Sequence, residues 1–310
     1  GSVSIDLGFP TAGVELPSNL RDNTDLNQIT QEVRLASTND SPFQWLIGVF
    51  YSDVERNYSQ RLPTPGYDFY TDLTLGAGTA AAVANGFPAD SPYNADLPYD
   101  IQQTALFGEM SYEFFDRLTI TAGGRYYSFD EERKFISGGL FANGDNRQDS
   151  TQSSGFTPRV IASYEATEDL RLNIQASQGF RLGGVNDPLN LPLCTPEDEL
   201  IFGGFQSYDD ETSWNYEAGA KWSRGNLTFN AAVFYNDIKD LQVTLDAGSC
   251  SSRISFNVPD AHAAGLEIET AWTPITGLEL SFAGSFVEAE FDSTVRDGNN
   301  NVIGGIESGN

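Results

Sequence analysis

Residues 211–245 read ETSWNYEAGAKW, then SRGNL, then TFNAAVFYNDIKDLQVTL. In the first part, large or small apolar side chains share one parity and polar ones share the other: Trp214, Tyr216, Ala218, Ala220 and Trp222 against Asn215, Glu217, Gly219 and Lys221. Strict alternation with a period of two is typical of a β-strand. After a short turn at 223–226 the alternation resumes, so the stretch predicts a long β-hairpin.

The row of apolar, even-numbered positions in the first strand of this hairpin begins and ends with a tryptophan. Trp214 and Trp222 are eight residues apart, which corresponds to about 19 Å along a strand tilted by about 45°. That distance is close to the spacing of the two aromatic girdles around a lipid-facing band. A soluble sheet that buries its apolar face is the alternative. We interpret the aromatic face as facing lipid and the face of Glu217 and Lys221 as facing a barrel lumen.

Similar alternation recurs along the chain and predicts about ten strands. The connections between them alternate in length: short at 38–42, 116–117, 166–169, 223–226 and 274–277, and long at 57–98, 137–154, 182–208 and 246–253. We expect residues 1–28 to be loop. Short turns on one rim and long loops on the other are typical of outer-membrane barrels. The sequence therefore predicts an all-β protein, a transmembrane antiparallel β-barrel with extracellular long loops.

Composition excludes several other classes. The net charge of −27 with only 17 Lys and Arg makes nucleic acid an unfavourable partner. No apolar run reaches the roughly 18 residues of a membrane-spanning helix. A single histidine, His262, excludes a catalytic triad, and we expect no enzyme activity, cofactor or metal site. The Gly76-x-Gly78 stretch lacks a βαβ context, and Asp297 lacks a glutamate at the calcium-loop spacing.

Six blocks of the sequence also resemble a known family. QEVRLAS, FQWLIGVFY, TPRVIASYEATEDLRLNIQASQGFRLGGVN, WNYEAGAKW, LTFNAAVFYNDIKDLQV and NVPDAHAAGLEIETAWTP are similar, in order, to the barrel of TonB-dependent outer-membrane receptors over most of residues 29–290. The resemblance implies a 22-stranded plugged barrel in the bacterial outer membrane. It also implies import of a scarce ligand, most commonly an iron chelate such as a ferric siderophore, with energy from the TonB complex.

Both ends of the chain look interrupted, because it begins GSVSID and ends GGIESGN. We therefore expect residues 1–310 to be an interior fragment of a receptor barrel. The plug domain, the N-terminal region that contacts TonB and the closing strands are expected to be absent from it.

Charged residues on the polar parity are candidates for contact with the lumen or the plug. They are Glu109, Glu113, Arg125, Arg159, Arg171, Glu217, Lys221, Glu267, Glu269 and Glu279. Unpaired buried charge costs several kcal/mol, so we expect most of them to pair across strands or with the plug; direct contact with a ligand is the alternative.

The candidate ligand site centres on Arg181. It continues the polar parity of Arg171 and is expected about 26 Å above the short turn, at the outer mouth. There it could attract an anionic chelate, with Phe180, Tyr67 and Tyr70 stacking on aromatic groups of the ligand; an arginine that merely ties loops together is the alternative. Cys194 and Cys250 lie in two different long loops and predict a disulfide in an oxidising compartment.

Two other functions stay open at this point. The chain could be a secreted, soluble all-β binding protein, or a passive porin-like channel. No residue identifies which ligand is imported.

Overall fold

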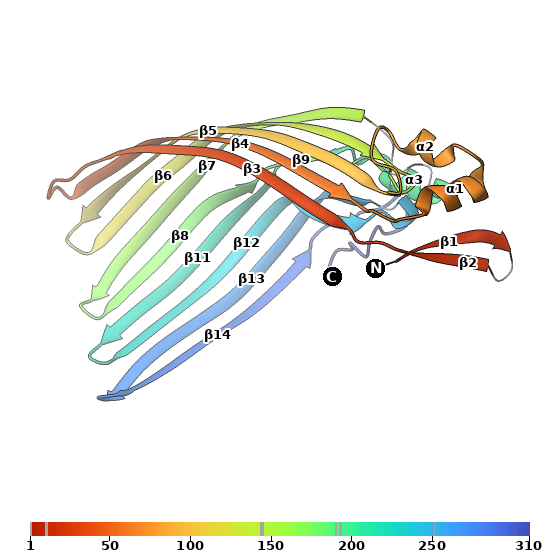
Figure 1. Ribbon diagram of the computed structural model, residues 1–310. Coiled ribbons are helices and arrows are strands. Elements are labelled where there is room, and N and C mark those ends of the chain that lie inside the picture. The colour runs from red at the N-terminus through yellow and green to blue at the C-terminus, as the bar shows by residue number, and fades with distance from the viewer. Residues whose placement is uncertain (1, 10–11, 143–145, 190, 192–193, 251) are drawn as a thin grey trace.

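The computed structural model describes residues 2–9, 12–142, 146–189, 191, 194–250 and 252–310. Its main feature is one antiparallel sheet of ten strands in the order β14-β13-β12-β11-β8-β7-β6-β5-β4-β3. The strands are β3 (Arg21–Ala36), β4 (Phe43–Arg61), β5 (Asn94–Phe114), β6 (Leu118–Gly138), β7 (Asn146–Thr167), β8 (Leu170–Arg181), β11 (Glu211–Arg224), β12 (Leu227–Asp246), β13 (Arg253–Ile275) and β14 (Leu278–Phe291). Each strand pairs with its neighbours in the chain, so the sheet is an up-and-down meander (Figure 1).

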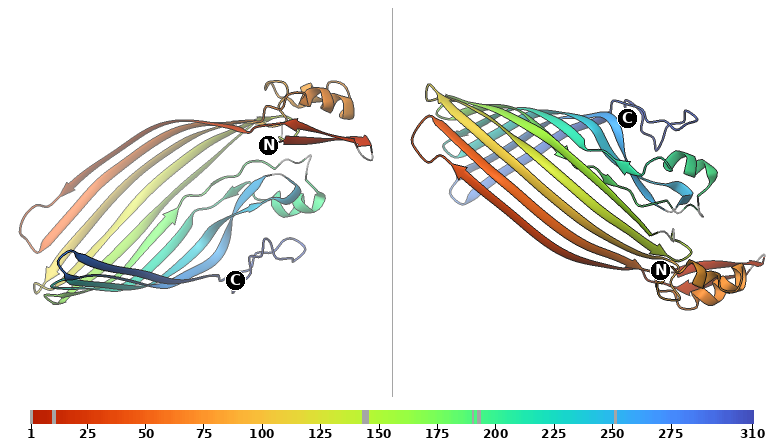
Figure 2. Two further views of the ribbon diagram at one scale, coloured as in Figure 1. Left: turned by 60° about the horizontal axis from the view of Figure 1, so that its bottom comes forward. Right: turned by 90° about the horizontal axis from the view of Figure 1, so that it is seen from above.

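The sheet curves into one wall of a barrel, with all five short turns at one end and the long loops at the other (Figures 1 and 2). The predicted alternation of connections between the two ends is therefore observed, but it is only partly a sorting by length. Connections 62–93 and 182–210 are long, whereas 139–145 and 247–252 span seven and six residues, against six for the turn at 37–42. Ten of the barrel's strands are present in the described chain, and the sheet does not close on itself, because β3 and β14 are its edges.

The two faces of the sheet differ as the alternation predicts. Tyr216 lies opposite Tyr235 and Trp222 opposite Phe229, whereas Lys221 on the other face lies opposite Asn230. Large apolar side chains of the first face are open to the surroundings: Phe286 is 68% exposed and Ile174 is 60% exposed. In the described chain the other two sheets are two-stranded and no second layer covers this face. The soluble alternative with an aromatic core is therefore wrong, and lipid is the medium that suits this face.

Three expectations about the loops are wrong in their boundaries. Residues 1–28 are not all loop, because β1 (Ser2–Phe9) pairs with β2 (Ala12–Pro17) and β3 already begins at Arg21. The expected loop at 137–154 is mostly strand, since β7 begins at Asn146. The connection from β4 to β5 is shorter than 57–98 and holds two helices, α1 (Tyr67–Leu75) and α2 (Thr79–Val83). Among the described residues, no helix is long and apolar enough to cross a membrane.

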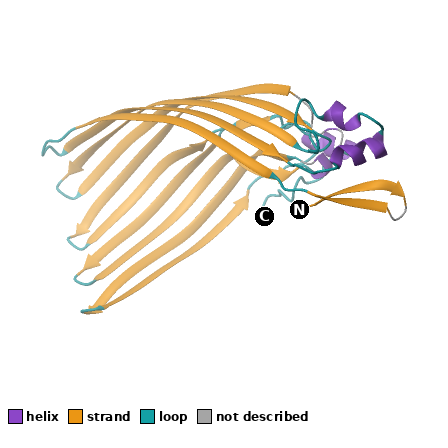
Figure 3. Cartoon of the chain, in the orientation of Figure 1, coloured by secondary structure: helices purple, strands orange, loops and turns teal. Residues whose placement is uncertain are grey.

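The helices lie at the end of the sheet that carries the long loops (Figure 3). The loops there have hydrophobic cores of their own. The larger core joins α3 (Pro196–Phe202), the 3-10 turn η2 (Gly248–Cys250), the outer part of β13 and the segment 295–306, and its buried members include Phe202, Ile254, Phe256, Val258 and Ile303. A smaller core joins β5, β6 and the short strand β9 (Gly184–Val185), which pairs with β10 (Ser207–Tyr208). Buried apolar contacts of this kind hold the loops in defined positions.

Gly265 in β13 permits a close cross-strand contact. It lies opposite Phe234, and a Cβ at this position would lie 2.5 Å from the Phe234 ring and 2.6 Å from the carbonyl oxygen of Phe286. The ring can move but the backbone cannot, so we expect Gly265→Ala to lower the free energy of unfolding by about 1–3 kcal/mol. Urea unfolding of the protein in detergent measures this change. Gly298→Ala is the matched control, because nothing lies within 4 Å of a Cβ there; equal midpoints for the two variants would contradict the prediction.

Candidate functional site

Aromatic and cationic side chains gather on the polar face where β4, β5 and β6 approach the loops. The register places Arg56 of β4 opposite Tyr99 of β5, and Tyr99 opposite Arg133 of β6. Arg133 is fifteen residues beyond the first residue of β6, which is about 35 Å above the short turn and beyond a lipid-facing band of about 25 Å. The group therefore lies outside the membrane, at the mouth of the barrel.

These side chains form a cation–aromatic cluster, which consists of Arg56, Tyr58, Tyr99, Arg133 and Phe135. The guanidinium of Arg133 lies 4.2 Å from the ring centre of Tyr99 and 4.6 Å from that of Phe135. The guanidinium of Arg56 lies 5.2 Å from the ring of Tyr58 and 5.5 Å from that of Tyr99. Each such contact is worth about 0.5–2 kcal/mol, more when water is excluded, so the cluster is a rigid platform.

Arg133 also fastens the loop that follows β8 to the wall. Its side chain is only 11% exposed and makes an ion pair of 2.6 Å with Asp187, and it donates to the carbonyl oxygen of Val185 in β9. Burial raises the pKa of Asp187, and the guanidinium of Arg133 opposes that shift. The charge of Arg133 is therefore neutralised by the protein itself.

A cavity of about 560 Å³ opens between this cluster and the tip of the β12–β13 hairpin. Its walls are mostly aromatic, small or apolar, with three charged side chains: Tyr93, Ala95, Leu97, Phe135, Ser137, Phe141, Ala142, Asp187, Pro188, Asp246, Gly248, Ser252 and Arg253. A volume of this size suits a small-molecule ligand. The cavity is therefore a candidate binding space.

Tyr93 contributes a hydrogen-bond donor to this cavity wall. Its hydroxyl donates to Oε1 of Gln60 at 3.1 Å, and burial, together with the nearby Asp187, raises the pKa of Tyr93 to about 12. The phenol is therefore protonated at neutral pH, and its O–H group is used in the hydrogen bond to Gln60. Within the described residues no group of three or more His, Cys, Asp or Glu side chains could hold a metal ion.

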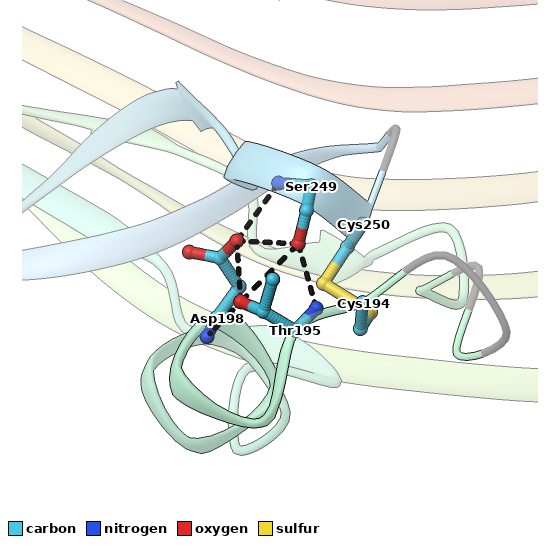
Figure 4. Close-up of a disulfide and its surroundings, with 5 residues drawn as sticks. All are labelled: Cys194, Thr195, Asp198, Ser249 and Cys250. Atoms are coloured by element: carbon cyan, nitrogen blue, oxygen red, sulfur yellow. Dashed lines mark hydrogen bonds between the residues drawn. A yellow bond between two sulfur atoms is a disulfide. The ribbon is translucent and has the colours of Figure 1, made fainter. Parts of the chain in front are cut away.

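The loops on the far side of the cavity are joined by a disulfide between Cys194 and Cys250 (Figure 4). Beside it, Oδ2 of Asp198 accepts hydrogen bonds from the backbone N–H of Ser249 at 2.9 Å and from its hydroxyl at 2.5 Å. Thr195 caps the N-terminus of α3 by accepting a hydrogen bond from the N–H of Asp198. The disulfide and these hydrogen bonds fix α3 against η2.

The hydrogen bonds from Ser249 hold the pKa of Asp198 below its usual range. A carboxyl group whose pKa is lowered in the folded state stabilises that state above its unfolded pKa of about 4, and this contribution is lost as the pH falls through the lowered pKa. We therefore expect the linked loops to open more often below about pH 4. The rate at which a phosphine reduces the buried disulfide, measured from neutral to acidic pH, should rise several-fold in that range.

The matched variant for this experiment is Asp198→Asn, which keeps an oxygen acceptor but has no charge to lose. We expect it to show the fast rate at every pH. A wild-type rate that stays flat across the range, equal to that of the variant, would contradict the assigned role of Asp198.

The four residues expected around the ligand lie in two pairs, Tyr67 and Tyr70 on α1 and Phe180 and Arg181 at the end of β8. Arg181 lies 3.7 Å from Glu211, its partner across the strands, and within 3.5 Å of the carbonyl oxygen of Gln242. Phe180 stacks on Tyr127, with ring centres 3.7 Å apart. Tyr67 is only 2% exposed, so its ring cannot stack on a ligand, and Tyr70 is half-buried on the same helix. Arg181 thus contacts two neighbouring strands, β11 through Glu211 and β12 through Gln242.

The charged residues expected on the lumen side lie on one face of the sheet by the register. Glu109 and Arg159 approach to 3.7 Å, Arg171 pairs with Glu165, and Glu217 accepts a hydrogen bond from Gln175. Arg125 lies over the ring of Phe50. A hollow of about 190 Å³ is lined in part by Glu217, Lys221, Glu267 and Glu269, while Glu113 and Glu279 have no ion pair among the described side chains. Three of the ten charges, those of Glu109, Arg159 and Arg171, thus have an ion-pair partner across strands among the described residues.

The other sequence candidates have local partners. Nδ1 of His262 contacts the carboxylate of Asp292 at 2.9 Å. Asp297 accepts hydrogen bonds from the backbone N–H groups of Asn299 and Asn301, which close its own turn. Glu131 of β6 is buried, at 8% exposure. Sequence inspection missed the cation–aromatic cluster, although the parity of Tyr99 and Arg133 was a usable signal.

Comparisons with protein families, with curated proteins and with solved structures all point to the same family. A family model described as the TonB dependent receptor-like β-barrel matches residues 4–306. The pesticin receptor of Yersinia enterocolitica is 28% identical over 211 residues, which cover 67% of this chain and 29% of that protein. The chain therefore spans less than a third of the length of this relative.

Two solved structures share the fold at low identity. The ferric yersiniabactin uptake receptor FyuA from Yersinia pestis aligns with a TM-score of 0.66 at 20% identity, over 88% of this chain and 37% of that one. The siderophore receptor PiuA from Acinetobacter baumannii aligns with a TM-score of 0.60 at 15% identity, over 91% of this chain and 41% of that one.

Proposed function

This chain belongs to the family of TonB-dependent receptors, and from that premise we propose that it forms part of the wall of an outer-membrane receptor that imports a scarce ligand. The ligand is a ferric siderophore or another iron complex, and the TonB complex supplies the energy. The observation that carries the proposal is the arrangement of one wall: an apolar face open to lipid, a charged inner face, and long loops that enclose a cavity at one end.

We further propose that residues 1–310 are an interior part of a longer receptor. In hydrocarbon every backbone N–H and C=O group must be paired. β3 and β14 each pair on one side only, so further strands are needed to close the barrel. The plug domain then packs against the inner face, where Glu217, Glu267 and Glu269 border an open hollow. The long loops are extracellular in this arrangement.

The nature of the cavity supports a ligand that arrives already chelated. Its walls combine aromatic rings with hydrogen-bonding groups, which suits an organic chelate. The relatives described above include a siderophore receptor and a ferric yersiniabactin uptake receptor, which makes iron chelates the first class to test.

The test is uptake of radioactive iron by iron-starved cells, supplied as a panel of ferric chelates, in strains with and without the full-length receptor and with and without TonB. We expect at least one chelate whose uptake requires both proteins. Uptake that needs the receptor but persists without TonB would identify a passive channel instead, and uptake of every chelate without the receptor would refute the transport function.

A further inference from the structure

The two longest loops at the mouth of the barrel carry charge of one sign only. Residues 62–93 contain Asp68, Asp72 and Asp90, and residues 182–210 contain Asp187, Glu197, Asp198, Glu199, Asp209 and Asp210, whereas neither segment contains a Lys or an Arg. A mouth with charges of one sign raises the local concentration of ligands of the opposite sign and lowers that of like-charged ones. The field of these loops therefore disfavours the approach of anions.

Three arginines near the cavity compensate little for this field, because each has a carboxylate partner. Arg56 has ring contacts instead and does not line the cavity. Arg133 pairs with Asp187 at 2.6 Å, and Arg61 pairs with Asp96 at 2.7 Å. Arg253 lies 3.5 Å from Asp246. An anionic ligand would have to displace these carboxylates before it could use the positive charges.

The carboxylates, in contrast, keep free acceptor capacity. The side chain of Asp187 is 46% exposed and that of Asp246 is 87% exposed, and both line the cavity. A carboxylate offers about four acceptor positions, of which a single partner uses one or two. Between them lie the rings of Phe135 and Phe141 and the apolar side chain of Leu97, which suit an aromatic or aliphatic body.

From these features we infer that the mouth cavity takes a neutral or cationic chelate that bears an aromatic or apolar group and hydrogen-bond donors, and that it rejects polyanionic chelates. The inference rests on the proposed function and specifies the class of ligand for the same receptor. It replaces the expectation of an anionic chelate held by Arg181, since Arg181 has its own partner in Glu211.

The experiment compares three ferric chelates of similar size on the full-length receptor in lipid nanodiscs. One is a trihydroxamate chelate with a free ammonium group, one is a neutral cyclic trihydroxamate chelate, and one is a tricatecholate chelate with three negative charges. We expect the first two to bind at least about tenfold more tightly than the third at low ionic strength, with the difference shrinking as salt is added.

Variants assign the effect to the cavity. Asp246→Asn should weaken binding of the cationic chelate by about three- to tenfold and leave the neutral chelate within about twofold, since one nearby charge is worth about 1 kcal/mol in a partly wet site. Asp187→Asn should also weaken binding of the cationic chelate. It additionally removes the ion-pair partner of Arg133, so Asp246→Asn is the simpler variant to interpret. Glu199→Gln is the matched control, with the same charge change on α3 outside the cavity lining, and should change neither affinity by more than about twofold.

Two outcomes would overturn the inference. A receptor that takes up iron through TonB but binds the trianionic chelate as tightly as the cationic one would refute the charge preference and leave the proposed function intact. A receptor that binds none of the three chelates and shows no TonB-dependent uptake of any iron complex would refute both.

Discussion

Replacing Cys194 and Cys250 together by serine is expected to lower the free energy of unfolding of the receptor by about 4 kcal/mol. The two cysteines are 56 residues apart, so the disulfide closes a long loop in the unfolded chain, and in the chain-entropy model the stabilisation grows with the length of that loop. Cys250 is fully buried within the larger loop core. Urea unfolding of the full-length receptor in detergent, with and without the cysteine pair, measures the difference.

The same variant should lose order first in the outer loops. β11 and β12 keep their pairing in the sheet, whereas α3 and η2 keep only the hydrogen bonds of Thr195, Asp198 and Ser249 and their apolar contacts. Limited proteolysis should therefore cut within residues 182–206 before any strand. Ser249→Ala is the control that removes hydrogen bonds but not the covalent link, and it should cost only about 1 kcal/mol. Unfolding midpoints that do not differ between the wild type and the double variant would show that the disulfide does not stabilise the fold.

Arg133→Met is expected to destabilise the mouth by about 2 kcal/mol and to weaken binding of any ligand in the cavity by about tenfold or more. Methionine keeps much of the volume but removes the ion pair with Asp187, the hydrogen bond to Val185 and the contacts with two rings. This loss of stability is smaller than that expected on breaking a fully buried ion pair, because the side chain of Asp187 is 46% exposed and water can solvate it once Arg133 is gone. Hydrogen exchange of residues 184–188 and ligand titration measure the two effects.

The next residue offers the matched control for Arg133. Lys134 is exposed, points to the opposite face by the alternation of β6 and has no ion pair among the described residues, so Lys134→Met should change neither property measurably. Combining Arg133→Met with Asp187→Asn should cost less than the sum of the two single changes, because the partners are in contact. Additive effects, or equal effects of Arg133→Met and Lys134→Met, would show that the ion pair does not hold the loop.

The membrane-spanning part of the fold could be predicted from the sequence because lipid constrains every second residue there. Trp214, Tyr216 and Trp222 must be apolar when they face hydrocarbon, and the other parity is free to be polar. Outside the bilayer this constraint disappears although the backbone pairing continues. The outer part of β7, NRQDSTQSS, and the first residues of β3, RDNTD, are polar on both faces, and for this reason they were expected to be loop.

The candidate site was harder to predict for a related reason. Its residues come from strands and loops that are remote in sequence: Arg56, Tyr99 and Arg133 meet by strand pairing, and Asp187 reaches them on a loop from β8. Parity could place the first three on the inner face, but it could not show that Arg133 is neutralised or that Tyr67 is buried. The choice of Arg181 followed from its height and parity alone, and neither quantity reveals a partner such as Glu211.

By itself, the sequence determined the kind of molecule: an antiparallel barrel wall with one lipid-facing side, short turns at one rim and long loops at the other. These properties are periodic and local, because each position that contacts hydrocarbon must carry an apolar residue, and this can be read directly from the sequence. Only the tertiary structure decided where the strands end, which cations are already neutralised and where the cavity opens. Those properties depend on partners brought together by strand register and loop packing, and the energy of an ion pair or a ring contact depends on distances that no single stretch of sequence contains.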